Sequence, residues 1–171
     1  MKKVLFIFLS IFAFYSCDDG DVDIPAMDFD EEVNRCDLIF NDYTLFRLGG
    51  SEALIVLLSN SVLKEEETTD PIYVAITETN VMYRTFNNSI DKNYFCNAIP
   101  PTSPTVLKNW TGVRGENNNI VVETVAEKDG SDNITGYKHT ITFENLNLEN
   151  GGNFIIYEET DFGEIIIPVS N

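Results

Sequence analysis

Hydrophobic and polar residues alternate with a period of two over most of the chain after residue 32, a pattern typical of strands that bury one face. The clearest alternation lies in residues 137–144, where one series is apolar apart from a histidine and the other is polar. We expect the first series to face a core and the second to face solvent. The inward series is Tyr137, His139, Ile141 and Phe143, and the outward series is Lys138, Thr140, Thr142 and Glu144.

Turn-forming residues divide the body of the chain into short segments of this kind. The pattern predicts strands at residues 37–40, 44–48, 53–58, 72–77, 81–86, 105–110, 120–126, 137–146, 153–158 and 164–169. Hairpin connections are expected at Gly49-Gly50, Asp129-Gly130, Gly151-Gly152 and Asp161-Phe162-Gly163. The sequence therefore predicts an all-β fold, a single antiparallel β-sandwich-like domain over residues 33–171.

Residues 51–63 are open to two interpretations. Residues 53–58 form a continuous apolar run that fits a buried strand. Ser51 could instead cap a helix in which Leu54, Leu58 and Val62 recur at helical spacing. We favour the strand.

A second apolar run, residues 4–15, lies near the start of the chain and follows two lysines. Twelve residues of helix span roughly 18 Å, short of the ~30 Å hydrocarbon core of a bilayer, so an export signal over residues 1–16 is predicted instead of a membrane span. The ending Phe14-Tyr15-Ser16-Cys17 resembles a bacterial lipobox. That resemblance implies a lipid anchor on Cys17; the alternative is an ordinary secretory signal beside an incidental cysteine.

An acidic stretch follows Cys17, with eight acids and no base in residues 18–32. Its charges repel one another and it has few apolar residues, so we expect residues 17–32 to be a disordered tether. The stretch resembles the signal that sends lipoproteins of Bacteroidota to the outer face of the outer membrane, although a plain acidic spacer is the alternative. The expected location is the outer membrane, lipid-anchored and surface-exposed.

Charge narrows the possible partners. The chain of 171 residues has 28 acidic and 11 basic side chains and a formal charge of -17. Nucleic acids are excluded as expected partners, because such a domain repels phosphate. Membrane contact is expected only through the anchor at Cys17, and the soluble partner is an unknown protein or glycan.

Two cysteines remain once Cys17 is assigned to lipid. Cys36 and Cys96 would lie in an exported, oxidising compartment, where a disulfide between them is expected. Two buried free thiols are the alternative. A metal site has less support than either, since two cysteines and one distant histidine lack the usual ligand spacing.

Several motifs occur together in this chain: the lipobox, the acidic stretch, the segment Tyr94-Phe95-Cys96-Asn97-Ala98-Ile99-Pro100-Pro101, and Trp110 a few residues on. In these motifs the sequence resembles a group of uncharacterised flavobacterial lipoproteins. Coverage runs from about Cys17 to Ala126. The family has no known activity to transfer, so the resemblance implies a lipoprotein and nothing about chemistry.

Candidate chemistry is sparse. Asp129, Ser131 and Asn133 alternate like calcium ligands, but an EF-hand needs Gly where Ile134 stands, so a hairpin loop is favoured. His139 falls in the inward series and is expected in the core. We expect no catalytic residue, metal or cofactor. A hydrolase that uses a pair of carboxylates remains an alternative, because such pairs are recognised by separation in space.

Aromatic residues gather around Cys96 in the sequence. Tyr94 and Trp110 could form a platform for a ligand such as a sugar, but core packing beside a disulfide is the favoured interpretation. The function expected overall is a non-enzymatic binding or accessory module on a lipid anchor, with glycan binding through exposed aromatics as a more specific alternative.

Overall fold

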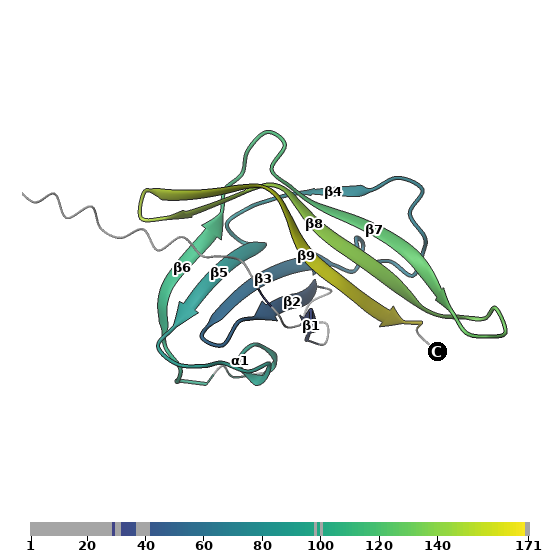
Figure 1. Cartoon of the computed structure of the whole chain (residues 1–171), viewed down its shortest axis with the longest axis horizontal. Coiled ribbons are helices and arrows are strands. Elements are labelled where there is room, and N and C mark those ends of the chain that lie inside the picture. Colours follow the sequence, from purple (N-terminus) through teal and green to yellow (C-terminus); the bar gives the residue numbers. More distant parts are fainter. Residues whose placement is uncertain (1–28, 30–31, 37–41, 98, 100, 170–171) are drawn as a thin grey trace, which may run out of the picture.

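A computed structural model describes residue 29, residues 32–36, residues 42–97, residue 99 and residues 101–169 (Figure 1). The predicted signal, Cys17, most of the tether and the strand expected at residues 37–40 lie outside this part. No helix of the described residues is long and apolar enough to cross a membrane. The strands are β1 (Asn34–Arg35), β2 (Asp42–Leu48), β3 (Glu52–Ser59), β4 (Ile72–Ala75), β5 (Val81–Phe86), β6 (Val106–Gly112), β7 (Asn119–Lys128), β8 (Ile134–Asn150) and β9 (Asn153–Pro168), and the short helix is α1 (Asn93–Cys96).

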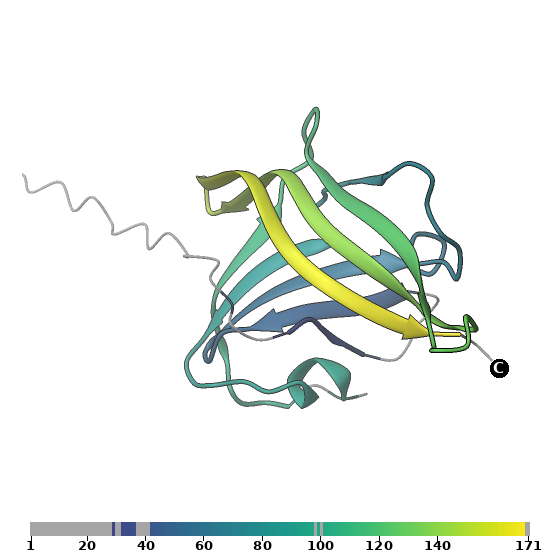
Figure 2. The ribbon, with the colours of Figure 1, turned by 45° about the vertical axis from the view of Figure 1, so that its right-hand side comes forward.

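All nine strands belong to one antiparallel sheet, which confirms the expected fold class. The order is β1-β2-β3-β5-β6-β8-β7-β4, and β9 pairs with the other edge of β8. Because β6 and β7 follow one another along a single edge of β8, the sheet folds over at this strand (Figure 2). The first layer is β1, β2, β3, β5 and β6, the second is β4, β7, β8 and β9, and one apolar core lies between them.

The long strand β8 serves both layers because its alternation is interrupted once. Before residue 145 the buried side chains include Ile141 and Phe143, and after it they are Leu146 and Leu148. Asn145 itself has φ 52°, a left-handed conformation that asparagine tolerates better than most residues, and its side chain donates to the Asn117 carbonyl at 3.1 Å. This break lets the strand turn while its apolar side chains stay on the inner side.

A bulge in β9 corrects one sequence prediction. Asp161-Phe162-Gly163 is not a hairpin connection between two strands. The ladder pairs Thr142 with Asp161 and Ile141 with Gly163, so Phe162 is the extra residue of a bulge in one continuous strand. Phe162 points inward, fully buried, with its ring centroid 5.8 Å from that of Phe143. Gly163, at φ 120°, supplies backbone freedom for this bulge instead of for a turn.

Strand β3 is buried on both faces, which explains the ambiguity of residues 51–63. Leu54, Val56 and Leu58 face the core between the layers. Ala53 and Ile55 face a second apolar cluster on the outside of the first layer. A strand with two buried faces needs a continuous apolar run, so the expected strand is confirmed and the helical spacing is coincidental.

The segment around α1 covers that second cluster. Phe95 packs on Phe46 of β2 with ring centroids 4.8 Å apart. The predicted disulfide is present: Cys36, just after β1, is bonded to Cys96 at the end of α1, with Cα atoms 5.1 Å apart. The bond fixes the covering segment to the edge of the first layer.

One residue of the predicted tether is packed on the body. Phe29 is 4% exposed and lies in the main core, with its ring centroid 6.5 Å from that of Tyr83. Its carbonyl accepts a hydrogen bond from Arg47, whose guanidinium also lies over the Phe29 ring at 5.8 Å. Packing of the chain onto the domain therefore includes residue 29, four residues before the boundary that the sequence suggested.

Loss of the disulfide should weaken the fold measurably. Replacing both cysteines (Cys36→Ser with Cys96→Ser) should lower the free energy of unfolding by up to about 4 kcal/mol, because the bond closes a loop with a sequence separation of 60. Urea unfolding of the wild type and the double variant measures the difference. Reduction of the wild type should lower stability by a similar amount, and equal midpoints for all three samples would contradict the prediction.

Candidate functional site

The two aromatic residues of the possible platform lie on opposite faces of the first layer. Trp110 of β6 pairs with Tyr83 of β5, and both belong to the core between the layers. Tyr94 lies on the outer face, edge-on to Phe86 with ring centroids 4.9 Å apart. Trp110 is only 4% exposed, so a sugar ring cannot stack on it. The possible platform at Tyr94 and Trp110 is therefore excluded, and the favoured core position of Trp110 is confirmed.

Three hollows open along β9 instead. One, of about 480 Å³, lies on the outer face of the second layer. A second, of about 540 Å³, shares Glu144 and Glu159 with it. A third, of about 630 Å³, shares Asp161 with the first and lies between β9 and the residues around β1. The three hollows share lining residues, and we call the surface that they occupy along the strand the β9 groove. From Glu158 to Ile166 it follows the strand for roughly 26 Å, at about 3.3 Å per residue.

The register of the second layer builds the floor of the groove. Residues directly opposite one another on antiparallel strands point to the same face, so each row of pairs places its side chains side by side. Two neighbouring rows supply six of the eight residues that line the first hollow. One row is Tyr73, Val121, Thr142 and Asp161, and the next is Ala75, Asn119, Glu144 and Glu159.

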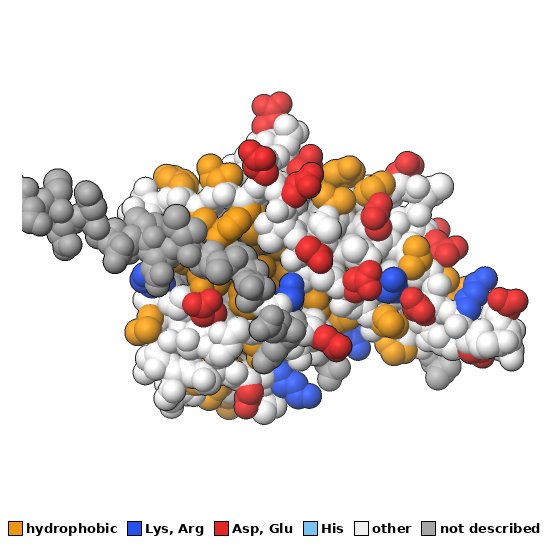
Figure 3. Space-filling view, viewed as in Figure 1, with side chains coloured by type: hydrophobic (Ala, Val, Ile, Leu, Met, Phe, Trp, Pro, Cys, Tyr) orange, Lys and Arg blue, Asp and Glu red, His pale blue; other side chains and the backbone are white. Residues whose placement is uncertain are grey.

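The groove is strongly acidic. Acidic side chains gather over β8 and β9 in Figure 3. Its lining includes six acidic and two basic side chains, an excess of four formal negative charges. Glu144 and Glu159 are directly opposed on adjacent strands, a pairing of like charges that is unfavourable by itself. Only Glu144 of these two has a described partner outside the pair, the side-chain amide of Asn119 at 3.3 Å.

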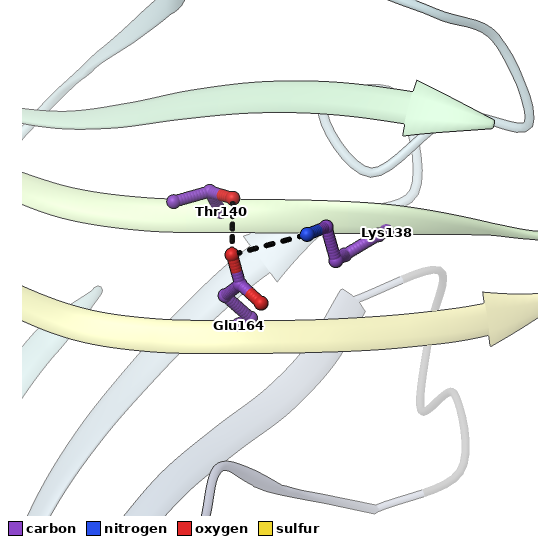
Figure 4. Close-up of polar contacts among 3 residues, drawn as sticks. All are labelled: Lys138, Thr140 and Glu164. Atoms are coloured by element: carbon purple, nitrogen blue, oxygen red, sulfur yellow. Dashed lines mark hydrogen bonds and ion pairs between the residues drawn. The ribbon is translucent and has the colours of Figure 1, made fainter. Parts of the chain in front are cut away.

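The two basic side chains of the lining lie at the end near β1 and are engaged there. Lys138 Nζ is 3.3 Å from Glu164 Oε1, and the Thr140 hydroxyl donates to the same oxygen at 3.2 Å (Figure 4). Arg47 is held by Phe29, as described above. Lys138 and Thr140 belong to the series expected to face solvent, and the structure places them on the outer face. The first and second hollows form the other end of the groove, and the described residues that line them include no basic side chain.

One exposed aromatic residue lines the groove. Tyr73 is 60% exposed because it points away from the core. Its neighbours on the same strand, Ile72 and Val74, pack against the core. The sequence reasoning missed this residue. The alternation within residues 72–77 indicates that Tyr73 faces outward, but its proximity to Asp161 depends on a pairing of β4 with β7 that no local pattern reveals.

His139, the single histidine, is fully buried, as the sequence predicted. Its Nδ1 shares a hydrogen bond of 2.8 Å with the Thr124 hydroxyl, and its Nε2 has no partner among the described residues. Burial lowers the pKa of His139 from its usual 6.5 to about 4. A ring enclosed in the core cannot exchange protons with a ligand in the groove, so His139 has a structural role.

Acidic and polar side chains also gather at the turn around Asp129. Asp129 closes the turn between β7 and β8 by accepting from the Ser131 and Asn133 backbone N–H groups at 2.8 and 3.0 Å, which fits the expected hairpin loop. Hydrogen bonds from Asn133, first from its side chain, lower the pKa of Asp129. In the part of the chain that is described, no group of three or more His, Cys, Asp or Glu side chains could hold a metal ion.

Comparison with protein-family models, with curated proteins and with solved structures finds no match. Functional inference therefore depends on the groove itself.

Buried His139 should make the protein sensitive to mild acid. The pKa of His139 in the folded protein lies below its value in the unfolded chain, so the free energy of unfolding is highest above about pH 6.5. It decreases as the pH falls towards 4, by about 3 kcal/mol in all. Denaturant unfolding at several pH values should show a shallower decline over this interval for His139→Asn, which keeps a partner for Thr124. Parallel pH profiles for the two proteins would contradict the prediction.

Proposed function

We propose that the protein is a non-enzymatic binding module, exported and held on the outer membrane by a lipid on Cys17, and that the β9 groove is its ligand-binding surface. One observation carries the proposal: three open hollows that share lining residues follow β9, the first on the outer face of the second layer and the third between β9 and the residues around β1. An open groove suits contacts along an extended ligand, whereas small substrates are usually enclosed in a deeper cavity. The lipobox and the acidic stretch after it support the anchoring.

Glycan binding is a second candidate function, and Tyr73 favours it. An exposed aromatic ring offers an apolar face to a sugar, and the carboxylates and threonine hydroxyls that line the same hollow could bond to sugar hydroxyls. This site differs from the one that the sequence suggested, since Tyr73 takes the place of Tyr94 and Trp110.

The anchor is tested at Cys17. Cys17→Ser should abolish acylation and move the protein from membranes to the soluble fraction. The reason is that each methylene of an acyl chain buried in the bilayer contributes about 0.8 kcal/mol to membrane binding. Labelling with a fatty acid and fractionation of cells measure both effects. A variant that stays with membranes, together with an unlabelled wild type, would contradict the lipid anchor.

The binding surface is tested by filling the groove. Thr142 lies between Tyr73 and Asp161, and Thr142→Trp should block the first hollow without changing the charge. The full chain, purified in detergent, would be applied to printed arrays of peptides and oligosaccharides. We expect a ligand that wild type binds and Thr142→Trp loses by about tenfold or more, while Ile134→Trp, an exposed position outside the groove lining, retains it.

Mass spectrometry of the recovered ligand separates binding from catalysis. A ligand recovered unchanged supports a binding module, and a cleaved ligand would replace the proposal with the carboxylate-dependent hydrolase. Equal binding by the two tryptophan variants would show that the groove is not the binding surface.

A further inference from the structure

We infer that the acidic end of the β9 groove, where Glu144, Glu159 and Asp161 line the first two hollows beside Tyr73, binds an extended polypeptide segment of a partner protein through lysine or arginine side chains. This inference rests on the proposed function and names the chemical class of its ligand. It uses the outer face of the second layer, which no described segment of the chain covers.

The charge of a ligand is indicated by an uncompensated like-charge pair. Glu144 and Glu159 occupy directly opposed positions of the β8–β9 ladder, and Asp161 lies in the adjoining row. Lys138 and Arg47 are at the opposite end of the groove, each with contacts of its own. A positively charged group placed between the carboxylates would replace repulsion by attraction, whereas a neutral ligand would remove them from water without that gain.

Tyr73 provides an independent reason to expect a cationic side chain. Its ring is 60% exposed and lines the same hollow as Glu144, Glu159 and Asp161. An aromatic face next to carboxylates can hold the ammonium or guanidinium group by a cation–π contact and can pack against the methylene stem behind it. Lysine and arginine combine such a stem with a charged head, and sugars have no charge to match.

The shape of the site favours an extended chain over an isolated cation. The first two hollows share two lining residues, Glu144 and Glu159, and the third shares Asp161 with the first, so the three follow one another along β9. At about 3.3 Å per residue, the roughly 26 Å of groove would accommodate about eight residues of extended polypeptide. A second copy of this protein is a poor occupant of the same surface, because pairing two such grooves would bring like charges together.

The test compares two sets of variants that change the net charge equally. The groove set is Glu144→Gln, Glu159→Gln and Asp161→Asn combined. The control set is Glu66→Gln, Glu78→Gln and Glu116→Gln combined, at exposed positions outside the groove lining. The probe is a nonapeptide of alternating lysine and serine, with a glutamine-for-lysine peptide and a neutral linear oligosaccharide as controls. Binding to the full chain in detergent would be measured by fluorescence anisotropy at low and at physiological salt.

We expect the lysine peptide to bind, the groove set to weaken it by about tenfold or more, and the control set to change it by less than about twofold. Tyr73→Ala should weaken binding severalfold, and Tyr73→Phe should largely preserve it because the ring is kept. Removing the opposed carboxylates relieves repulsion, so the groove set should unfold at no lower denaturant concentration than wild type, and lost binding then reflects the groove.

Equal losses for the two sets would show that bulk charge attracts the peptide, and this would overturn the inference. Failure of the lysine peptide to bind wild type would also overturn it. Binding of the oligosaccharide, lost in Thr142→Trp, would assign the groove to glycans: the proposed binding function would then stand while the polypeptide inference fell. If no ligand bound the wild type more tightly than Thr142→Trp, both the polypeptide inference and the proposed binding function would be overturned.

Discussion

Pairing on both edges of β8 is the constraint on which the rest of the structure depends. β9 follows one edge from Gly136 to Asn150, and β7 and β6 share the other edge in succession. A strand with two partners on one edge has to belong to both layers. The left-handed conformation at Asn145 and the bulge at Phe162 are the local adjustments that keep apolar side chains of β8 and β9 inside through the turn.

The same pairing concentrates acidic residues on one surface. β8 and β9 contribute their outward carboxylates to adjoining rows, so charges distant in sequence, such as Glu144 and Glu159, become neighbours. An arrangement that folding alone would disfavour is expected where a surface also serves binding. The opposed carboxylates therefore fit the proposed binding role of this outer face better than a purely structural role.

Local features of the fold were predictable from the sequence, and features that depend on strand partners were not. The alternation in residues 137–144 predicted both faces of β8. The export expected from residues 1–17 was the basis for predicting the Cys36–Cys96 disulfide. The inward position of Trp110 depends on its pairing with Tyr83, and the merger of two expected strands into β9 depends on Phe162 entering the core. The groove combines β4, β7, β8 and β9, so only the register could bring Tyr73 to Asp161.

The outer faces of the two layers differ in their cover and in their polarity. The outer face of the first layer is occupied by the segment around α1, which the disulfide fixes over Phe46 and Ile55. The second layer has no such cover among the described residues, and its outer face has hydroxyls, carboxylates and an exposed tyrosine in place of an apolar cluster. Because a covered apolar face contributes to stability and an open polar face does not, the fold explains the outer face of the first layer, whereas the outer face of the second layer is the one to which we assign the proposed binding.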